Sequence, residues 1–67
     1  MDIRGRLARN VKRLRKERGW SQEKLAAQAG VHRTYISGIE RRMRNASIMA
    51  IERLMKALAV KAGQLLD

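Results

Sequence analysis

The chain has 67 residues, including 16 Lys or Arg and 6 Asp or Glu, which gives a formal net charge of +10 at pH 7. It lacks cysteine and proline, which excludes disulfides and thiolate metal sites and favours helix nearly throughout. No apolar run has the length of a membrane span, and the N-terminus lacks the apolar core of a signal peptide. We therefore expect one small cytoplasmic domain over residues 1–67, with a polyanion as its partner.

The first predicted helix spans residues 3–18, with Asp2 as its N-cap and Gly19 as a left-handed end. Half of the basic residues of the chain belong to this helix. We interpret most of them as a solvated face and a few as lying near phosphates; a helix resting on an anionic membrane is the alternative. The inward face carries apolar side chains at helical spacing, namely Ile3, Leu7, Val11 and Leu14.

Trp20 follows this break, and we expect it to pack into the core between the first two helices, with base stacking as the alternative. Ser21 is a favourable N-cap for a second helix over residues 22–28. Gln22 then lies in the first helical turn, where its amide and the helix N-terminus can face a phosphate. The alternative for Gln22 is an ordinary exposed position at a helix start.

Residues 22–41 have the pattern of a helix-turn-helix. Ala26 is small enough for two short helices to cross steeply, and Gly30 tolerates the positive φ of a sharp turn. The joint pattern favours a motif that binds DNA over the alternative, an ordinary αα-hairpin with glycine at its turn. The inward positions on both sides of the turn are apolar, namely Leu25, Ala29, Val31, Ile36 and Ile39.

The third predicted helix, residues 33–41, presents polar side chains on its first turn. In this docking geometry the N-terminal residues of the second helix of the motif meet the major groove. Arg33 can bind guanine O6 and N7 with both arms of its guanidinium, and Thr34 can bind a base or a thymine methyl. Ser37 lies one turn further on the same side. Tyr35 either packs against the sugar–phosphate backbone or is half-buried.

Glu40 is the one acid on this otherwise basic helix, and we predict that it pairs with Arg15 of the first helix. Gly38 within the helix allows close approach of DNA or of another helix. Residues 42–47 form a polar connection, for which a solvated loop is the alternative to phosphate contact. The backbone contacts predicted in this region are Arg41, Arg42, Arg44 and Asn45.

Ser47 is the predicted N-cap of a fourth helix over residues 48–58, and residues 62–66 can form a short fifth helix. The expected buried stripe of the fourth helix is Ile48, Ile51, Leu54, Met55 and Leu58. Apolar side chains at the C-terminal end exceed what a small core needs, which favours self-association over simple core closure. These candidate dimerisation residues are Val60, Leu65 and Leu66.

From Gly19 to Ser47 the chain resembles the Cro/CI (Xre) type of regulator, and RTYISGIERRMRNAS at 33–47 is similar to the controller proteins of restriction–modification systems. The resemblance implies an all-α, compact five-helix, lambda-repressor-like domain with its helix-turn-helix at helices two and three. It also implies symmetric dimers on paired half-sites. The residues that it implicates are Arg33 and Thr34 for bases, and Gln22, Tyr35, Ser37, Arg44 and Asn45 for the backbone or nearby bases.

Three positions depart from the common pattern of these regulators. Ala46 replaces a frequent proline, and Arg42 replaces a frequent glycine at a position that can require positive φ. His32 occupies a position where a Ser, Thr or Asp would cap the third helix.

Together these features favour a homodimeric transcription regulator that binds a palindromic operator and is associated with the nucleoid when bound. An antitoxin-like interaction module with secondary DNA binding is the first alternative, and non-specific nucleic-acid packaging is another. One histidine and six scattered carboxylates offer no nucleophile–base pair and no metal-ligand cluster. We therefore expect no catalytic residue, metal, cofactor or small-molecule ligand.

Overall fold

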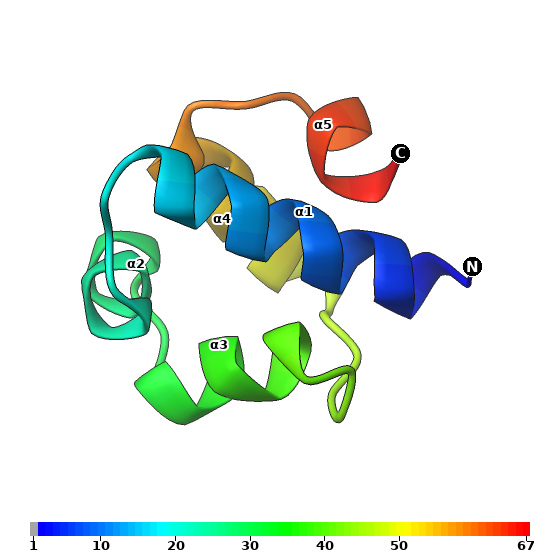
Figure 1. Cartoon of the computed structure of the whole chain (residues 1–67), viewed down its shortest axis with the longest axis horizontal. Helices are drawn as coiled ribbons and strands as arrows, with labels where there is room; N and C mark the ends of the chain where they lie inside the picture. Colours follow the sequence, from blue (N-terminus) through cyan, green and yellow to red (C-terminus); the bar gives the residue numbers. More distant parts are fainter. Residues whose placement is uncertain (1) are drawn as a thin grey trace.

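Five helices and no strand make up residues 2–67, the part of the chain that the computed structural model describes (Figure 1). This arrangement confirms the predicted all-α, five-helix architecture. The helix boundaries differ from the predicted ones by one residue at most. The elements are α1 (Ile3–Glu17), α2 (Gln22–Ala29), α3 (Arg33–Glu40), α4 (Ile48–Leu58) and α5 (Ala62–Leu66).

Three helices begin at the side-chain caps that the sequence predicts. Asp2, Ser21 and Ser47 each accept a hydrogen bond from the backbone N–H three residues later, at 2.9, 3.0 and 3.1 Å. These bonds satisfy donors that a helix start otherwise leaves without a partner. His32 makes no such bond at the start of α3, as expected for a residue that is a poor cap.

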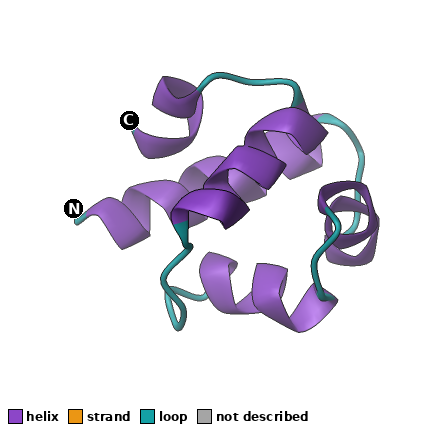
Figure 2. Cartoon of the chain, turned by 180° about the vertical axis from the view of Figure 1, so that it is seen from behind, coloured by secondary structure: helices purple, strands orange, loops and turns teal. Residues whose placement is uncertain are grey.

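The core lies where α1 meets the other helices. Figure 1 shows α3 and α5 on opposite sides of α1, and Figure 2 shows the same arrangement from behind. Trp20 packs against the edge of this core, which confirms its predicted place. The large side chains with essentially no exposed surface come from all five helices: Val11, Leu25, Ile36, Ile39, Leu54, Leu58 and Leu65.

The first four helices end in the same way, with one residue in the left-handed conformation. The backbone N–H groups of that residue and of the next one bond back to carbonyls of the last turn, which is the Schellman motif. The left-handed residues are Gly19, Gly30, Arg42 and Ala59, with φ of 70°, 71°, 62° and 56°. The positive φ anticipated at Arg42 is therefore confirmed, and Ala59 adds a second non-glycine case.

Two apolar positions assigned to the inward faces are solvent-exposed instead. Ile48 is 86% exposed, so its place in the buried stripe of α4 was wrong, and Ile3 on α1 is 51% exposed. Both lie in the first turn of a helix, beyond the neighbours that cover the later turns. Ala50 is buried near the start of α4 instead. None of the helices within residues 2–67 is long and apolar enough to cross a membrane.

Candidate nucleic-acid interface

A buried ion pair fixes the end of α3 to α1. Arg15 donates from Nε to Glu40 Oε2 at 2.8 Å and from Nη2 to Oε1 at 2.9 Å. Its third nitrogen, Nη1, donates to the carbonyl of Trp20 at 2.8 Å. The two side chains are only 10% and 4% exposed, and the hydrogen bond to Glu40 raises the pKa of Arg15 above its ordinary value. The predicted pair is confirmed, and its planar two-bond geometry sets the orientation of α3.

Gln22 joins the same cluster from the start of α2. Its side-chain amide nitrogen donates to Glu40 Oε1 at 3.2 Å, and the residue is partly buried. The carboxylate therefore links α1, α2 and the last turn of α3. The sequence did not indicate this bond, because it depends on how α2 and α3 cross. Contact between Gln22 and a phosphate stays a prediction.

The opposite side of α3 borders an open hollow of about 260 Å³. The three side chains predicted to bind bases, Arg33, Thr34 and Ser37, are brought together along it. Arg33 and Thr34 are fully exposed, so their polar groups are available to a partner. Three further residues complete the lining, namely Gly38, Arg41 and Met43. Met43 drew no attention in the sequence, because nothing in its immediate neighbours indicates which way it points.

The connection between α3 and α4 folds back onto α3 through Tyr35. The Tyr35 hydroxyl accepts from the backbone N–H of Ser47 at 3.2 Å and lies 3.5 Å from the carbonyl of Asn45, to which it donates. The guanidinium of Arg44 lies over the Tyr35 ring, 5.3 Å from its centroid, as a cation–π contact. Of the two alternatives for Tyr35, the half-buried one is observed within the single chain.

Gly38 makes room for this connection. A Cβ atom placed on Gly38 would lie 3.2 Å from Cβ of Arg44, which is tighter than an ordinary contact. The close neighbour of Gly38 is therefore the loop after α3, and not another helix. Arg41, Arg42, Arg44 and Asn45 are all exposed on this loop, where their predicted contacts with phosphates are sterically open.

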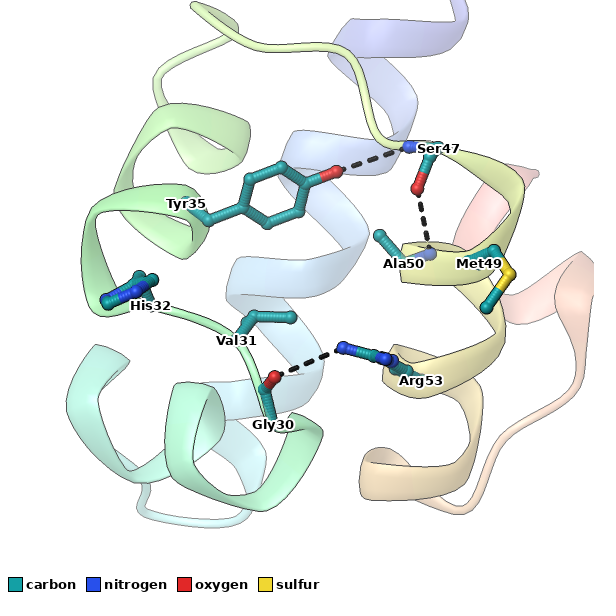
Figure 3. Close-up of a pocket in the computed structure, with 8 residues that line it drawn as sticks. All are labelled: Gly30, Val31, His32, Tyr35, Ser47, Met49, Ala50 and Arg53. Atoms are coloured by element: carbon teal, nitrogen blue, oxygen red, sulfur yellow. Dashed lines mark hydrogen bonds between the residues drawn. The ribbon is translucent and has the colours of Figure 1, made fainter.

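A shallow groove of about 400 Å³ separates the turn between α2 and α3 from the start of α4 (Figure 3). Tyr35 reaches across one end to Ser47, and Arg53 donates to the carbonyl of Gly30 at 3.2 Å across the other. Met49 and His32 lie along its edges. These two bridges connect the turn of the motif to α4.

Part of the basic face of α1 is engaged within the chain. Arg6 donates to the carbonyl of Leu66 at 3.0 Å, and Arg18 donates to the carbonyls of Leu14 and Leu58. Asn10, which is buried, donates to the carbonyl of Leu65 at 2.8 Å. The interpretation of this face as merely solvated was therefore incomplete. The sequence missed these bonds, because they join α1 to residues far along the chain.

The three candidate dimerisation residues differ in their surroundings. Leu65 is 0% exposed and belongs to the core of the single chain, whereas Val60 and Leu66 are partly exposed at its edge. Core closure therefore accounts for Leu65. Within the described part of the chain, no group of three His, Asp or Glu side chains has an arrangement that could hold a metal ion.

Comparison with known proteins places this geometry in a family. A family model described as helix-turn-helix matches residues 11–65, which is most of the chain. The chain belongs to this helix-turn-helix family, of the Cro/CI (Xre) type. The resemblance inferred from residues 19–47 is confirmed.

Two curated relatives are similar in sequence. A hypothetical transcription factor from Neisseria meningitidis serogroup B is 48% identical over 65 residues, covering 97% of this chain and 61% of its own length. Control protein C.BamHI from Bacillus amyloliquefaciens is 57% identical over 47 residues, covering 70% of this chain and 58% of its own. The chain therefore spans about three fifths of the length of these relatives.

Solved structures agree with the fold. The hypothetical transcription factor from Neisseria superposes with a TM-score of 0.94 and 47% identity, over 98% of this chain and 76% of that one. The restriction–modification controller protein C.Esp1396I, solved as a tetramer with its natural 35 base-pair operator, gives a TM-score of 0.84 at 41% identity, over 91% of this chain and 80% of that one. Both identities are high enough for the comparison to extend beyond shape alone.

Proposed function

We propose that the protein is a non-catalytic transcription regulator that binds a palindromic DNA operator as a homodimer, with α3 in the major groove. On this proposal Arg33, Thr34 and Ser37 contact base edges, and the protein is associated with the nucleoid when bound. The other proposed DNA contacts go to the sugar–phosphate backbone, from Gln22, Tyr35, Arg41, Arg42, Arg44 and Asn45.

The observation that carries this proposal is the division of α3 into two sides. Its inward side is fixed by the Arg15–Glu40 pair, and its outward side gathers Arg33 and its polar neighbours around an open hollow. A rigid helix that presents exposed donors, in a chain of net charge +10, suits both base contact and phosphate attraction. The relation to a controller protein solved on its operator supports the same function.

The proposed homodimer rests on size and on the relatives. A single 67-residue domain has a thin core, and a monomer reads too few base pairs for tight specific binding. The tetramer of C.Esp1396I on its operator supports assembly on DNA. We propose that Val60 and Leu66 contribute exposed surface to the dimer, while Leu65 supports that surface from inside the core. Mass measurement in solution for the protein and for Leu66→Ser tests this: Leu66→Ser is expected to be more dissociated, and an unchanged mass would remove Leu66 from the interface.

The experiment that tests the function is selection of bound DNA from a random library near physiological salt. Enrichment of an inverted repeat, with half-site centres about 34 Å or one helical turn apart, is the expected result for a dimer of this class. Tight binding without enrichment, weakening only with salt, would replace this proposal with non-specific packaging. Absence of DNA binding would contradict both.

A second candidate function, an antitoxin-like interaction module, is favoured by one observation. Ile48 and Met49 at the start of α4 are 86% and 63% exposed, which is unusual for large apolar side chains on so polar a surface. This module would bind a protein partner through α4 and bind DNA secondarily. The DNA selection separates the two, because Ile48→Ser together with Met49→Ser should leave the selected operator unchanged if the primary partner is DNA.

A further inference from the structure

The residue after each left-handed helix end is apolar in all four cases, but only one of these side chains lacks cover. In a Schellman motif this residue commonly packs against the side chain three or four places before the helix end. Three of the four pack against the core in this way, and Met43, after α3, is 72% exposed. The four residues in chain order are Trp20, Val31, Met43 and Val60.

The cause lies in the last turn of α3. The backbone bonds that close this end are intact, with Met43 N–H donating to the Gly38 carbonyl at 2.8 Å and Arg42 N–H to the Ile39 carbonyl at 3.1 Å. The two positions that would cover Met43 are Gly38 and Ser37, which offer no apolar side chain. The corresponding positions before the other three ends each include a large apolar residue, namely Leu14, Leu25 and Leu54.

The uncovered side chain lies at the hollow beside α3. Met43 lines this hollow together with Arg33, Thr34 and Ser37, which the proposed function assigns to base contact. Its backbone is fixed by the bond to Gly38, so its side chain is delivered to this place rather than free to move with a loose loop. Exposed cations on the same rim, Arg33 and Arg41, make a second copy of this basic chain an unfavourable cover.

We propose that Met43 is a specificity-determining residue whose thioether side chain packs against the 5-methyl group of a thymine in the major groove. This inference rests on the proposed function and adds an apolar contact to the polar ones. The 5-methyl of thymine is the one apolar feature that the major groove presents, and it distinguishes thymine from cytosine. Methionine suits it, because its flexible, polarizable side chain adapts to an irregular apolar surface.

The test replaces thymine by uracil, one position at a time, in the operator obtained by selection. Uracil lacks only the methyl group, so the base-pairing edge and the sugar–phosphate backbone remain the same. At one thymine in each half-site, the wild-type affinity is expected to fall about fourfold, the effect of one buried methyl-sized group. Met43→Ala is expected to bind the thymine operator about fourfold or more weakly and to be insensitive to uracil at that position.

Two matched variants complete the experiment. Met49→Ala removes another exposed methionine, one that lines the groove beside α4 and not the hollow, and it is expected to respond to uracil like the wild type. Val60→Ala, at the corresponding position after α4, is expected to lower the melting temperature, whereas Met43→Ala is expected to leave it unchanged.

Two results overturn the inference while leaving the proposed function intact. In one, Met43→Ala keeps the wild-type sensitivity to uracil at every position, so that any loss of affinity comes from contact with deoxyribose or from the loop. In the other, Met43→Ala lowers the melting temperature as much as Val60→Ala, which would show that Met43 is covered within the chain. If selection enriches no operator at all, the proposed function fails first and this inference fails with it.

Discussion

The two sides of α3 are built on opposite principles. On the inward side every polar group has a partner, because Glu40 accepts from both Arg15 and Gln22 and its side chain is only 4% exposed. On the outward side Arg33, Thr34 and Met43 extend toward solvent around an open hollow. The difference indicates that substitutions on the inward side should act on stability and those on the outward side on binding.

The largest effect is expected on the inward side. Arg15→Ala leaves the Glu40 carboxylate buried with one weak donor, which should cost roughly 3–5 kcal/mol of unfolding free energy. That loss is a large part of the roughly 5–15 kcal/mol typical of a small domain, so the variant should unfold near physiological temperature. Thermal and urea unfolding followed by circular dichroism measure it. A loss below about 1 kcal/mol would show that the pair is exchangeable with water.

A double substitution distinguishes the burial of charge from the need for contact. Arg15→Met with Glu40→Met replaces both partners by apolar side chains of similar length, and such replacements are often neutral or stabilising. This protein should therefore melt near the wild-type temperature. It should bind DNA more weakly all the same, because the two-bond geometry that orients α3 is lost. Unchanged affinity in a folded double variant would limit the ion pair to a structural role.

The next effect is expected on the outward side. Arg33→Ala should leave the melting temperature unchanged, since the side chain is exposed, and should cost about 1–3 kcal/mol of binding free energy to the selected operator. The loss should be confined to sequences that carry the contacted base pair. Lys12→Ala on α1 is the control and should weaken all DNA slightly. Equal losses for the two variants on specific and random DNA would contradict base contact by Arg33.

These contrasts also explain which features the sequence could predict. Helix limits, the three caps and the positive φ at Arg42 depend on a few neighbouring residues and were anticipated within one position. The Arg15–Glu40 pair was anticipated because a lone acid on a basic helix has few places to go. These local patterns and charge arguments cover most of the fold and the outward side of α3.

The features that the sequence did not reveal depend on packing between distant segments. The bond from buried Asn10 to the Leu65 carbonyl joins residues 55 positions apart, and no periodicity encodes it. Likewise the exposure of Ile48 follows from where its neighbours stop, although its spacing fits the buried stripe. Met43 is the third case, because its place in the hollow follows from the absence of a side chain at Gly38.

A smaller effect sharpens the comparison between the ends of α3 and α4, which both turn through a non-glycine residue. A left-handed conformation costs such a residue roughly 1–2 kcal/mol, of which glycine recovers a part because it also loses more backbone entropy on folding. Ala59→Gly and Arg42→Gly should therefore each stabilise the fold by about 0.5–1 kcal/mol. Unfolding in urea measures both variants under the same conditions.

Only one of these two variants should change DNA binding. Arg42 lies on the exposed loop after α3, and its replacement should weaken all DNA and lower the slope of log affinity against log salt by about 0.9, the value for one phosphate contact. Ala59→Gly should leave both quantities unchanged. An Arg42→Gly protein with the wild-type salt slope would show that an arginine is kept at this strained position for a reason other than phosphate.

The smallest effect concerns Asp2, the acid at the start of α1, and it depends on pH. The hydrogen bond from the Gly5 N–H, helped by the charges of Arg4 and Arg42, lowers the pKa of Asp2 below its ordinary value of 3.8. Because the folded pKa is the lower one, the charged cap adds stability above the unfolded pKa, and this is lost as pH falls through the folded pKa.

Asp2→Asn isolates this charge, since asparagine caps a helix about as well as aspartate but does not titrate. The wild type should melt slightly above Asp2→Asn near pH 6, and the difference should vanish near pH 2, where both side chains are neutral. A difference that persists at low pH would mean that the carboxylate geometry, and not its charge, stabilises α1. Because Asp2 is fully exposed beside basic residues, added salt should shrink the difference at pH 6, whereas the buried Arg15–Glu40 pair should respond much less.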